Sequence, residues 1–352
     1  MNLVILGLSI TSSWGNGHAT TYRALVRELD AQGHQVLFLE RDRPWYAAAR
    51  DLPHPPWGKT ILYDGLPELQ ERFAPAVAAA DLVIMGSYVP EGVAVGEWLL
   101  KTAQGVRAFY DIDTPVTLAK LRRQDYEYIA PHLIGQFDLY LSFTGGPVLD
   151  ELERIYGARR ARPLYCSFDP SVYYPEQHDL SIDLGYLGTY SDDRQPGLER
   201  LLIQPARTWP AGSFAVAGPQ YPASINWPEN LLRIEHLPPA EHRSFYCRQR
   251  FTLNITRAEM VRTGYAPSVR LFEAAACGVP VISDYWAGLE TFFCPGKELL
   301  VANSTEESLS YLLEMPEAER QRLGERARDR VLREHTAAHR VQELETYLAE
   351  AR

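Results

Sequence analysis

Cysteine is scarce in this chain of 352 residues, which contains four. Cys166, Cys247, Cys277 and Cys294 form no Cys-x-x-Cys pair, and no histidine stands at a spacing typical of zinc ligands. The pattern argues against a metal site and indicates buried, reduced thiols. A catalytic thiol is the alternative interpretation.

A long hydrophobic run is missing from the start of the chain. The segment MNLVILGLSI has no basic flank and no small-residue cleavage site, and its apolar run is too short to span a bilayer. We therefore expect it to be the first strand of a cytoplasmic enzyme without a transmembrane segment.

The chain also lacks an excess of positive charge. The formal net charge is −10, which argues against nucleic acid or an anionic membrane as a general partner. A local basic cleft is still compatible with this charge and could hold phosphates.

Apolar runs typical of strands alternate with helical patterns along the chain, which is too long for one hydrophobic core. The first half contains the strand-like runs LVILGLS, QVLFLE, DLVIMGS, VRAFYDID and DLYLSF, and the second half contains LGYLGTY, SFAVAG, RIEHL, FTLNIT, PVIS and ELLVA. A polar stretch at 176–183 separates the two halves. The alternation predicts two doubly wound parallel α/β domains, with ligands in the loops that follow the strands.

The segment Gly264 to Glu290, GYAPSVRLFEAAACGVPVISDYWAGLE, is the most informative part of the chain. Pro267 suits the first helical position, and apolar residues at helical spacing continue until Gly278. Free N–H groups at a helix start can hold a diphosphate. From Ser268 to Glu273 the axial rise is roughly 7 Å at about 1.5 Å per residue, which suits the span from a diphosphate to ribose hydroxyls. The alternative is an ordinary α/β unit with a solvated glutamate.

One stretch of the second half resembles the nucleotide-sugar site of GT-B glycosyltransferases, and most closely the CgeB-like (spore-maturation protein) branch. This stretch is LNITRAEMVRTGYAPSVRLFEAAACGVPVISDYWAGLETFFCPGKELLVA. The resemblance extends more loosely through GYLGTYSDDR at 185–194 and back to GLSITSSWGNGHATTYRALVREL. It implies two Rossmann-like domains facing a central cleft, with Glu273 as the ribose-binding glutamate. Related family-4 enzymes carry a second glutamate eight positions earlier, where this chain has Tyr265.

The resemblance also implies the domain organisation and the reaction. We expect an acceptor-side domain at 1–177, a nucleotide-sugar domain at 178–334, and a last helix at 335–352 that crosses back to the first domain. The implied activity is hexosyltransferase-like transfer from a nucleoside-diphosphate sugar, with a UDP-sugar as the expected donor and no other cofactor. Family-4 enzymes suggest retention of configuration without a metal, and an inverting route with His18 or an aspartate as base stays open.

The loop ITSSWGNGH follows the first strand and ends where a helix starts, so Gly15, Asn16 and Gly17 could approach the donor sugar or acceptor. His18 is its one group that moves protons near neutral pH, and a helix-capping or core histidine is the alternative. Glu40 ends the second strand, where a dinucleotide-binding acid would stand. The missing Gly-x-Gly-x-x-Gly pattern argues against a dehydrogenase.

Asp111 and Asp113 end the fourth strand-like run, two residues apart and on one face if extended. They could act as a base or accept hydrogen bonds from sugar hydroxyls. The alternative is that Asp113 or Thr114 caps the following helix, and Thr114 is the favoured cap.

The second domain carries the expected donor-binding residues. Arginine suits a diphosphate because its guanidinium stays charged and binds two oxygens at once. Among the arginines, Arg257 is the one most expected to bind the diphosphate, and it is also expected to be catalytic. Arg270 could instead form an ion pair on the surface. Trp286 could stack on a nucleobase or pack in the core. The expected donor-binding set also includes Gly188, Thr189, Tyr190, Arg194, Asn254, Arg262, Tyr265, Ala266, Pro267, Ser268 and Glu273.

The sequence thus predicts a glycosyltransferase with a nucleotide-sugar donor and an acceptor that is a small molecule, a glycan or a protein. Two other functions remain open. One is a sugar-nucleotide epimerase or hydrolase on the same fold, which needs no acceptor. The other is a nucleotide-sugar-binding protein without catalysis, because Tyr265 replaces a glutamate near the chemistry.

Overall fold

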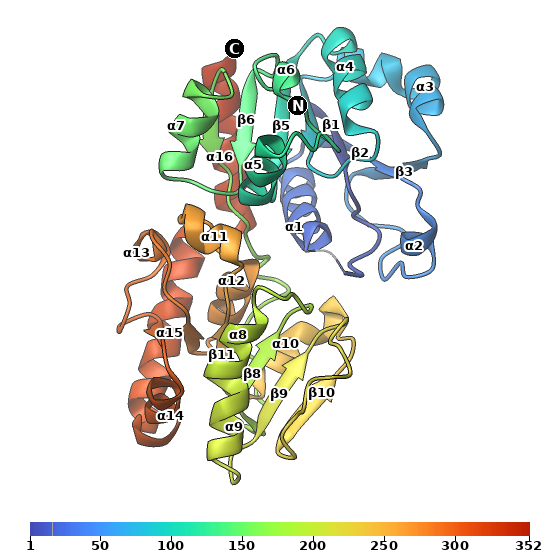
Figure 1. Ribbon diagram of the computed structural model, residues 1–352. Helices are drawn as coiled ribbons and strands as arrows, with labels where there is room; N and C mark the ends of the chain where they lie inside the picture. Colours follow the sequence, from blue (N-terminus) through green and yellow to red (C-terminus); the bar gives the residue numbers. More distant parts are fainter. Residues whose placement is uncertain (16) are drawn as a thin grey trace. The chain divides into compact units, whose positions relative to one another are not determined.

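The computed structural model describes residues 1–15 and 17–352 and divides them into two compact units. Unit 1 consists of Met1–Ser167 together with Ala337–Arg352, and unit 2 consists of Phe168–Thr336 (Figure 1). The predicted glycine-loop residue Asn16 lies outside the described residues.

Unit 1 is built on a seven-stranded parallel sheet with the strand order β3-β2-β1-β4-β5-β6-β7. The reversal of strand order beside β1 is the mark of a doubly wound sheet. Its strands are β1 Asn2–Gly7, β2 Gln35–Arg41, β3 Lys59–Tyr63, β4 Leu82–Gly86, β5 Val106–Asp111, β6 Leu139–Ser142 and β7 Ala161–Pro163.

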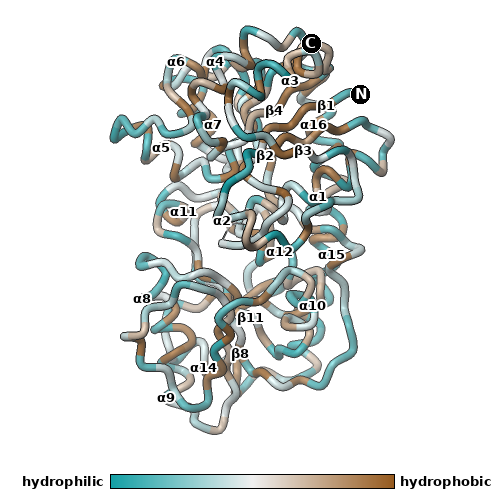
Figure 2. Tube along the Cα trace, turned by 90° about the vertical axis from the view of Figure 1, so that its right-hand side faces the viewer, coloured by the Kyte–Doolittle hydropathy of each residue, from teal (hydrophilic) through white to brown (hydrophobic). Residues whose placement is uncertain are grey.

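Helices connect these strands, and the last helix of the chain returns to unit 1. They are α1 His18–Ala31, α2 Pro44–Ala47, α3 Leu66–Ala79, α4 Gly92–Thr102, α5 Thr114–Arg122, α6 Pro131–Ile134, α7 Pro147–Arg154 and α16 Ala337–Ala351. Helix α16 packs against α1 and β6. The central strands are apolar on both faces because helices cover both sides, and Figure 2 shows this as hydrophobic colour along β1 and β4.

Unit 2 repeats the arrangement with a six-stranded parallel sheet in the order β10-β9-β8-β11-β12-β13. The strands are β8 Ile182–Leu187, β9 Phe214–Ala217, β10 Leu231–Ile234, β11 Gln249–Asn254, β12 Val281–Ser283 and β13 Leu300–Val301. Two domains of doubly wound parallel strands confirm the predicted α/β fold class.

The helices of unit 2 include one π-helical segment, Glu199–Ile203, between two short α-helices. The α-helices are α8 Gln195–Leu198, α9 Gln204–Thr208, α10 Pro239–Cys247, α11 Ala258–Thr263, α12 Val269–Ala276, α13 Leu289–Phe292, α14 Thr305–Glu314 and α15 Glu317–Glu334. Among the described residues, no helix is both long enough and apolar enough to cross a membrane.

The chain passes from unit 1 to unit 2 between Ser167 and Phe168, ahead of the polar stretch at 176–183. Phe168 is fully buried and forms a β-bridge with Thr336, at the other end of unit 2. The backbone N–H of Glu176 donates to the sulfur of Cys247, over 3.4 Å. The first residue of the polar stretch is therefore hydrogen-bonded to unit 2, and Phe168, which precedes the stretch, is also paired within unit 2.

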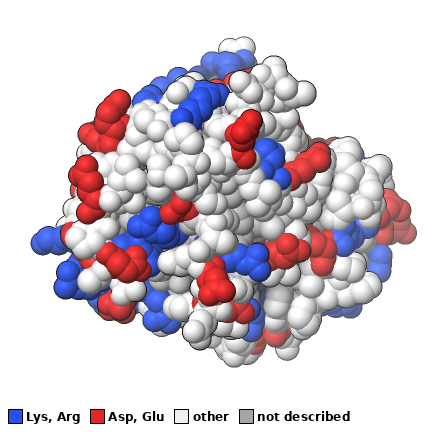
Figure 3. Space-filling model, turned by 90° about the horizontal axis from the view of Figure 1, so that it is seen from below, with Lys and Arg blue, Asp and Glu red and all other residues white. Residues whose placement is uncertain are grey.

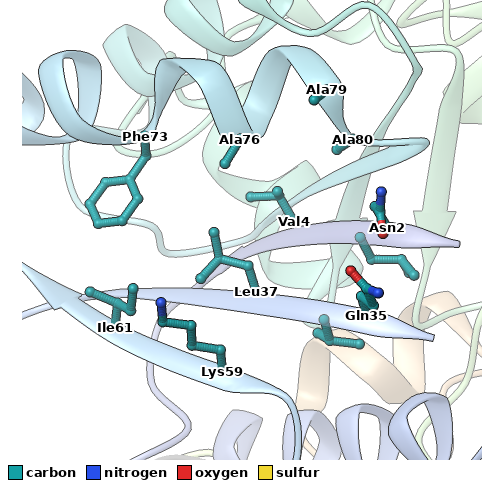
Figure 4. A pocket seen from close by; sticks show the side chains of 12 residues that line it. Asn2, Val4, Gln35, Leu37, Lys59, Ile61, Phe73, Ala76, Ala79 and Ala80 are labelled. Atoms are coloured by element: carbon teal, nitrogen blue, oxygen red, sulfur yellow. The ribbon is translucent and has the colours of Figure 1, made fainter. Parts of the chain in front are cut away.

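A groove of about 460 Å³ lies at the amino ends of β1, β2 and β3, beneath the second half of α3. Figure 4 shows Ala76 of α3 above Val4 and Leu37 of the strands. The helix presents Phe73, Ala76 and Ala79 to this groove and is followed by Ala80, and the small alanine side chains leave the space above the strands unfilled. The groove lies at the end of the sheet opposite to the post-strand loops.

We expect Ala76→Leu to stabilise unit 1, because the larger side chain fills this groove with apolar atoms. Cavity filling of this kind contributes about 0.5–2 kcal/mol. Thermal unfolding followed by calorimetry measures the change, and Ala74→Leu is the matched control because Ala74 does not line the groove. A lower melting temperature for Ala76→Leu than for Ala74→Leu would contradict the expectation.

Candidate functional site

Helix α12 follows the loop GYAPS and carries Glu273. Ser268 is its N-cap residue and Val269 its first helical residue, so Pro267 lies before the helix and not at its first position as predicted. The physical reason is the extended backbone of Ser268, which suits a cap. The Ser268 side chain makes no capping bond to the first N–H groups. The helix ends as predicted, with Gly278 at φ +73°.

Glu273 is buried, with 3% of its surface exposed, and is not solvated. The hydroxyl of Tyr246 donates to its Oε2 atom over 3.1 Å. Burial raises the pKa of Glu273 to about 7, although the hydroxyls of Tyr173 and Tyr246 and the charge of Arg270 favour the ionised form. Both tyrosines lie far from Glu273 along the chain, and no sequence pattern predicted that they would bond it.

Arg270 is also buried and makes no surface pair, which corrects the alternative considered from the sequence. Its Nε atom donates to the carbonyl of Leu187 at the end of β8, and its Nη1 atom donates to Asn254 Oδ1 over 2.8 Å. The guanidinium also lies 4.7 Å from the ring centroid of Tyr186. Arg270 therefore joins α12 to the carboxyl ends of two strands.

Asn254 ends β11 directly beside Ser283, which ends β12. Its Nδ2 atom donates to Ser283 Oγ over 3.0 Å while its Oδ1 atom accepts from Arg270. The Asp284 carboxylate accepts from the backbone N–H and the hydroxyl of Thr256, which fixes the loop after β11. Burial raises the pKa of Asp284. These polar groups share the carboxyl edge of the unit 2 sheet.

The loop after β8 contains Gly188, Thr189 and Tyr190. A Cβ atom on Gly188 would lie 2.7 Å from the Tyr186 hydroxyl and 2.8 Å from Arg270 Nη2, so a larger residue here would displace one of these side chains. The carbonyl of Thr189 accepts from Arg194 Nη2 over 2.6 Å. The Tyr190 hydroxyl donates to Asp192 over 2.6 Å.

The structure separates the predicted arginines into two kinds. The Nε atoms of Arg194 and Arg257 are buried and have no hydrogen-bond partner in the described part of the chain. The Arg262 side chain is 70% exposed and pairs with Glu259 one helical turn away, which is the arrangement of a solvated surface residue. Arg194 and Arg257 therefore each carry an unpaired buried N–H group, whereas Arg262 is a solvated residue.

Tyr265 has φ +51°, a left-handed backbone conformation that is uncommon for a bulky residue. Its N–H donates to the carbonyl of Ala287 over 2.7 Å, and a Cβ atom on Gly288 would lie 2.4 Å from its ring. Ala266, next in the loop, is fully buried. These contacts hold the loop before α12 against the loop after β12.

Trp286 packs in the core of unit 2. It is 1% exposed, and its ring lies 5.7 Å from that of Phe292. Of the two roles considered from the sequence, this position supports core packing, because no face of the ring is open for a nucleobase.

In unit 1, the loop after β1 is organised by the carboxylate of Glu40. Glu40 is fully buried and accepts hydrogen bonds from Ser9 Oγ, from the N–H groups of Ile10 and Thr11, and from Thr11 Oγ1, over 2.6–3.1 Å. These bonds occupy both oxygens, which argues further against a dinucleotide-binding role. Gly15 has φ +65°, and a side chain at Gly15 or Gly17 would meet nothing within 4 Å.

His18 is the first residue of α1 and is 6% exposed. Its Nε2 atom lies 3.3 Å from Asp113 Oδ2, and its Nδ1 atom is buried without a hydrogen-bond partner in the described residues. The ring of Tyr88 packs edge-on against the imidazole at 5.4 Å. A carboxylate therefore lies beside one ring nitrogen, and the other ring nitrogen is left unpaired by the described residues.

Asp111 and Asp113 differ sharply in their surroundings. Asp111 is fully buried, and its carboxylate accepts from the hydroxyls of Tyr140 and Thr117 over 2.6 and 2.7 Å. Burial raises its pKa to about 6. Asp113, not Thr114, is the N-cap residue of α5, because the helix begins at Thr114, whose hydroxyl donates to the Asp111 carbonyl. Asp113 thus faces His18, and Asp111 holds the turn.

Three of the four cysteines are buried, whereas Cys294 is exposed, contrary to the prediction for that residue. Among residues 1–15 and 17–352, no group of three or more His, Cys, Asp or Glu side chains is arranged to hold a metal ion.

Residues 194–346 match a protein-family model described as glycosyl transferase-like. The match covers most of unit 2 and part of α16. It supports the predicted enzyme class, a glycosyltransferase. A comparison with curated proteins found no match.

Solved structures match both units together. Sucrose-phosphate synthase from Thermosynechococcus elongatus matches with TM-score 0.72 and 16% identity, covering 99% of each chain. HepE from Anabaena, in complex with UDP and glucose, matches with TM-score 0.72 and 12% identity, again over 99% of each chain. An alpha-glucosyltransferase in complex with UDP-glucose and DNA matches with TM-score 0.72 and 12% identity, over 99% of this chain and 98% of that one. At these identities, the matches establish the GT-B fold.

We expect Glu273→Gln to stabilise the protein above neutral pH. The pKa of Glu273 lies near 7 in the folded protein and near 4.5 in the unfolded chain, so the folded protein binds more protons between these values. Wild-type stability therefore falls as pH rises through about 7, by up to about 3 kcal/mol, and glutamine escapes this loss. Melting temperatures at pH 5 and pH 8 test the expectation, and an equal difference at both pH values would contradict it.

Proposed function

We propose that this protein is a glycosyltransferase that transfers a sugar from a UDP-sugar to an acceptor hydroxyl, with Glu273 binding the ribose of the donor. The observation that carries the proposal is a buried carboxylate on the helix that starts at the carboxyl edge of the unit 2 sheet. Ligands of doubly wound sheets bind at this edge. An ionised carboxylate accepts two hydroxyl hydrogen bonds, and Tyr246 orients it.

Arg257 and Arg194 are the proposed partners of the diphosphate. Each carries a buried Nε atom without a protein partner, which a phosphate oxygen would satisfy. Their charges favour the departing diphosphate in the transition state. Ser268 and the start of α12 supply further N–H donors. Gly188 and Thr189 would line the donor from the loop after β8.

UDP is the proposed nucleotide because HepE and the alpha-glucosyltransferase are described in complexes with UDP or UDP-glucose. The identity of the sugar depends on Tyr265, which occupies the position of a glutamate in family-4 enzymes. The narrower membership in the CgeB-like branch is part of the proposal and rests on the quoted sequence segments.

The acceptor is proposed to be a small molecule, a glycan or a protein. The net charge of −10 supports a partner other than nucleic acid, and Figure 3 shows positive and negative groups interspersed on the face that it displays. The alpha-glucosyltransferase bound to DNA makes an oligonucleotide a necessary member of any acceptor screen.

Two stereochemical routes are considered. The resemblance to family-4 enzymes carries the first, a metal-independent transfer with retention in which the leaving phosphate takes the acceptor proton. The His18–Asp113 pair favours the second, an inverting transfer in which His18 Nδ1 takes that proton. The two routes yield products of opposite anomeric configuration, so proton NMR of the product distinguishes them.

We expect UDP to bind the wild type in the micromolar range and Glu273→Gln to weaken binding about tenfold to a hundredfold. The reason is the loss of a charged hydrogen-bond acceptor, which contributes about 1.5–3 kcal/mol. Calorimetric titration with UDP, GDP and dTDP, with and without magnesium, measures this.

Glu343→Gln is the matched control for this titration. Glu343 is a half-buried glutamate whose pKa is also raised by desolvation, but it lies in α16 and bonds Arg340. Equal weakening in both variants, or no binding of any nucleotide to the wild type, would overturn the proposed role of Glu273. Turnover of the donor without an acceptor would instead indicate a hydrolase or epimerase, and binding without any turnover a non-catalytic protein.

We expect His18→Gln to lower kcat by about 10²–10⁴-fold while UDP affinity stays within twofold of wild type. The His18 imidazole has an open nitrogen and Asp113 to orient it, whereas the nucleotide contacts lie in unit 2. Asp113→Asn should lower kcat less than His18→Gln does, because the imidazole is still present. A loss below tenfold in His18→Gln would favour the route in which the leaving phosphate is the base.

A further inference from the structure

Asp193 connects two loops that are 65 residues apart in the sequence. Its Oδ2 atom accepts a hydrogen bond from the backbone N–H of Ala258 over 2.8 Å. Its Oδ1 atom accepts from the hydroxyl of Ser191, within its own loop. The first loop follows β8 and the second follows β11, and these strands are neighbours in the sheet. One carboxylate therefore joins two post-strand loops at the carboxyl edge of unit 2.

The residues next to this bond are the two arginines with open Nε atoms. Arg194 directly follows Asp193, and Arg257 directly precedes Ala258. The Arg194 guanidinium is held on its own loop by the Thr189 carbonyl, 2.6 Å from Nη2. Both Nε atoms are buried and without a protein partner in the described residues. The Asp193–Ala258 bond thus sets the separation of two cationic groups on different loops.

We infer that Asp193 is a positioning residue for the diphosphate: it holds Arg194 and Arg257 at one separation, so that both engage the same diphosphate. This inference rests on the proposed function. Holding the two loops in advance saves the free energy of ordering them when the nucleotide binds. Asp193 does not contact the diphosphate in this proposal, because a carboxylate and a diphosphate repel each other and Asp193 is held by hydrogen bonds from the protein.

The neighbouring Asp192 provides a comparison of equal charge. Its carboxylate accepts a hydrogen bond from the Tyr190 hydroxyl of the same loop, and within the described residues it does not bond the loop after β11. Electrostatics alone predicts that removing either aspartate strengthens the binding of an anion, because a nearby negative charge disappears. If Asp193 instead positions the two arginines, its removal weakens the binding of UDP.

The experiment measures the affinity of UDP and of uridine for the full-length protein, the second as a competitor of UDP. We expect Asp193→Ala to weaken UDP binding at least tenfold and to change uridine binding less than twofold, because uridine carries no phosphate. Asp193→Asn should restore UDP affinity to within about threefold of wild type, because its amide oxygen still accepts from the Ala258 N–H. Asp192→Ala should leave UDP affinity unchanged or raise it.

Three results would overturn the inference. One is unchanged or tighter UDP binding in Asp193→Ala while the wild type binds UDP, which leaves the proposed function intact. Another is equal weakening of UDP and uridine together with a lower melting temperature, which indicates general loss of structure. The third is a wild type that binds no nucleotide, and this result alone also removes the proposed function.

Discussion

The buried guanidinium of Arg270 is the interaction on which the geometry of unit 2 depends. It bonds the Leu187 carbonyl at the end of β8 and Asn254 at the end of β11, from the first turn of α12. The start of α12 is thereby fixed relative to the strand ends, and Glu273 takes its place one turn further along. Burying an arginine costs free energy because the guanidinium loses its hydration. Here the cost is offset because the N–H groups of Arg270 donate to acceptors and its charge lies near Glu273.

Buried carboxylates at strand ends serve the same purpose in both units. Glu40 accepts four hydrogen bonds from the loop after β1, and Asp111 accepts two hydroxyls beneath the turn that carries Asp113. Asp284 does so for the loop after β11. Short loops contain backbone N–H groups that lack partners in the sheet, and an acceptor at the neighbouring strand end satisfies them. A few buried groups are left without a partner among the described residues, and His18 Nδ1 is one of them.

The alternation of apolar runs was sufficient to predict the central strands of both sheets and the two-domain α/β fold, because a buried parallel strand is hydrophobic on both faces. It missed the edge strands β3 and β7, the second of which has three residues and ends in Pro163. Strand β3 is only partly buried along most of its length and β7 is very short, so neither shows a long buried apolar run. The helix with Glu273 was predicted nearly to the residue, and its start was displaced from Pro267 because Ser268 is the cap.

The sequence by itself determined the fold class, the order of elements and the loops in which polar groups gather, since these follow from local periodicity. Only the tertiary structure decided which polar groups act together. From the sequence, Arg262 was expected to bind the donor and Arg270 was open to a surface role, yet Arg270 is buried against Asn254 and Arg262 is solvated beside Glu259. Burial and partnership depend on residues distant in the chain, as between Tyr246 and Glu273, and no local pattern encodes such contacts.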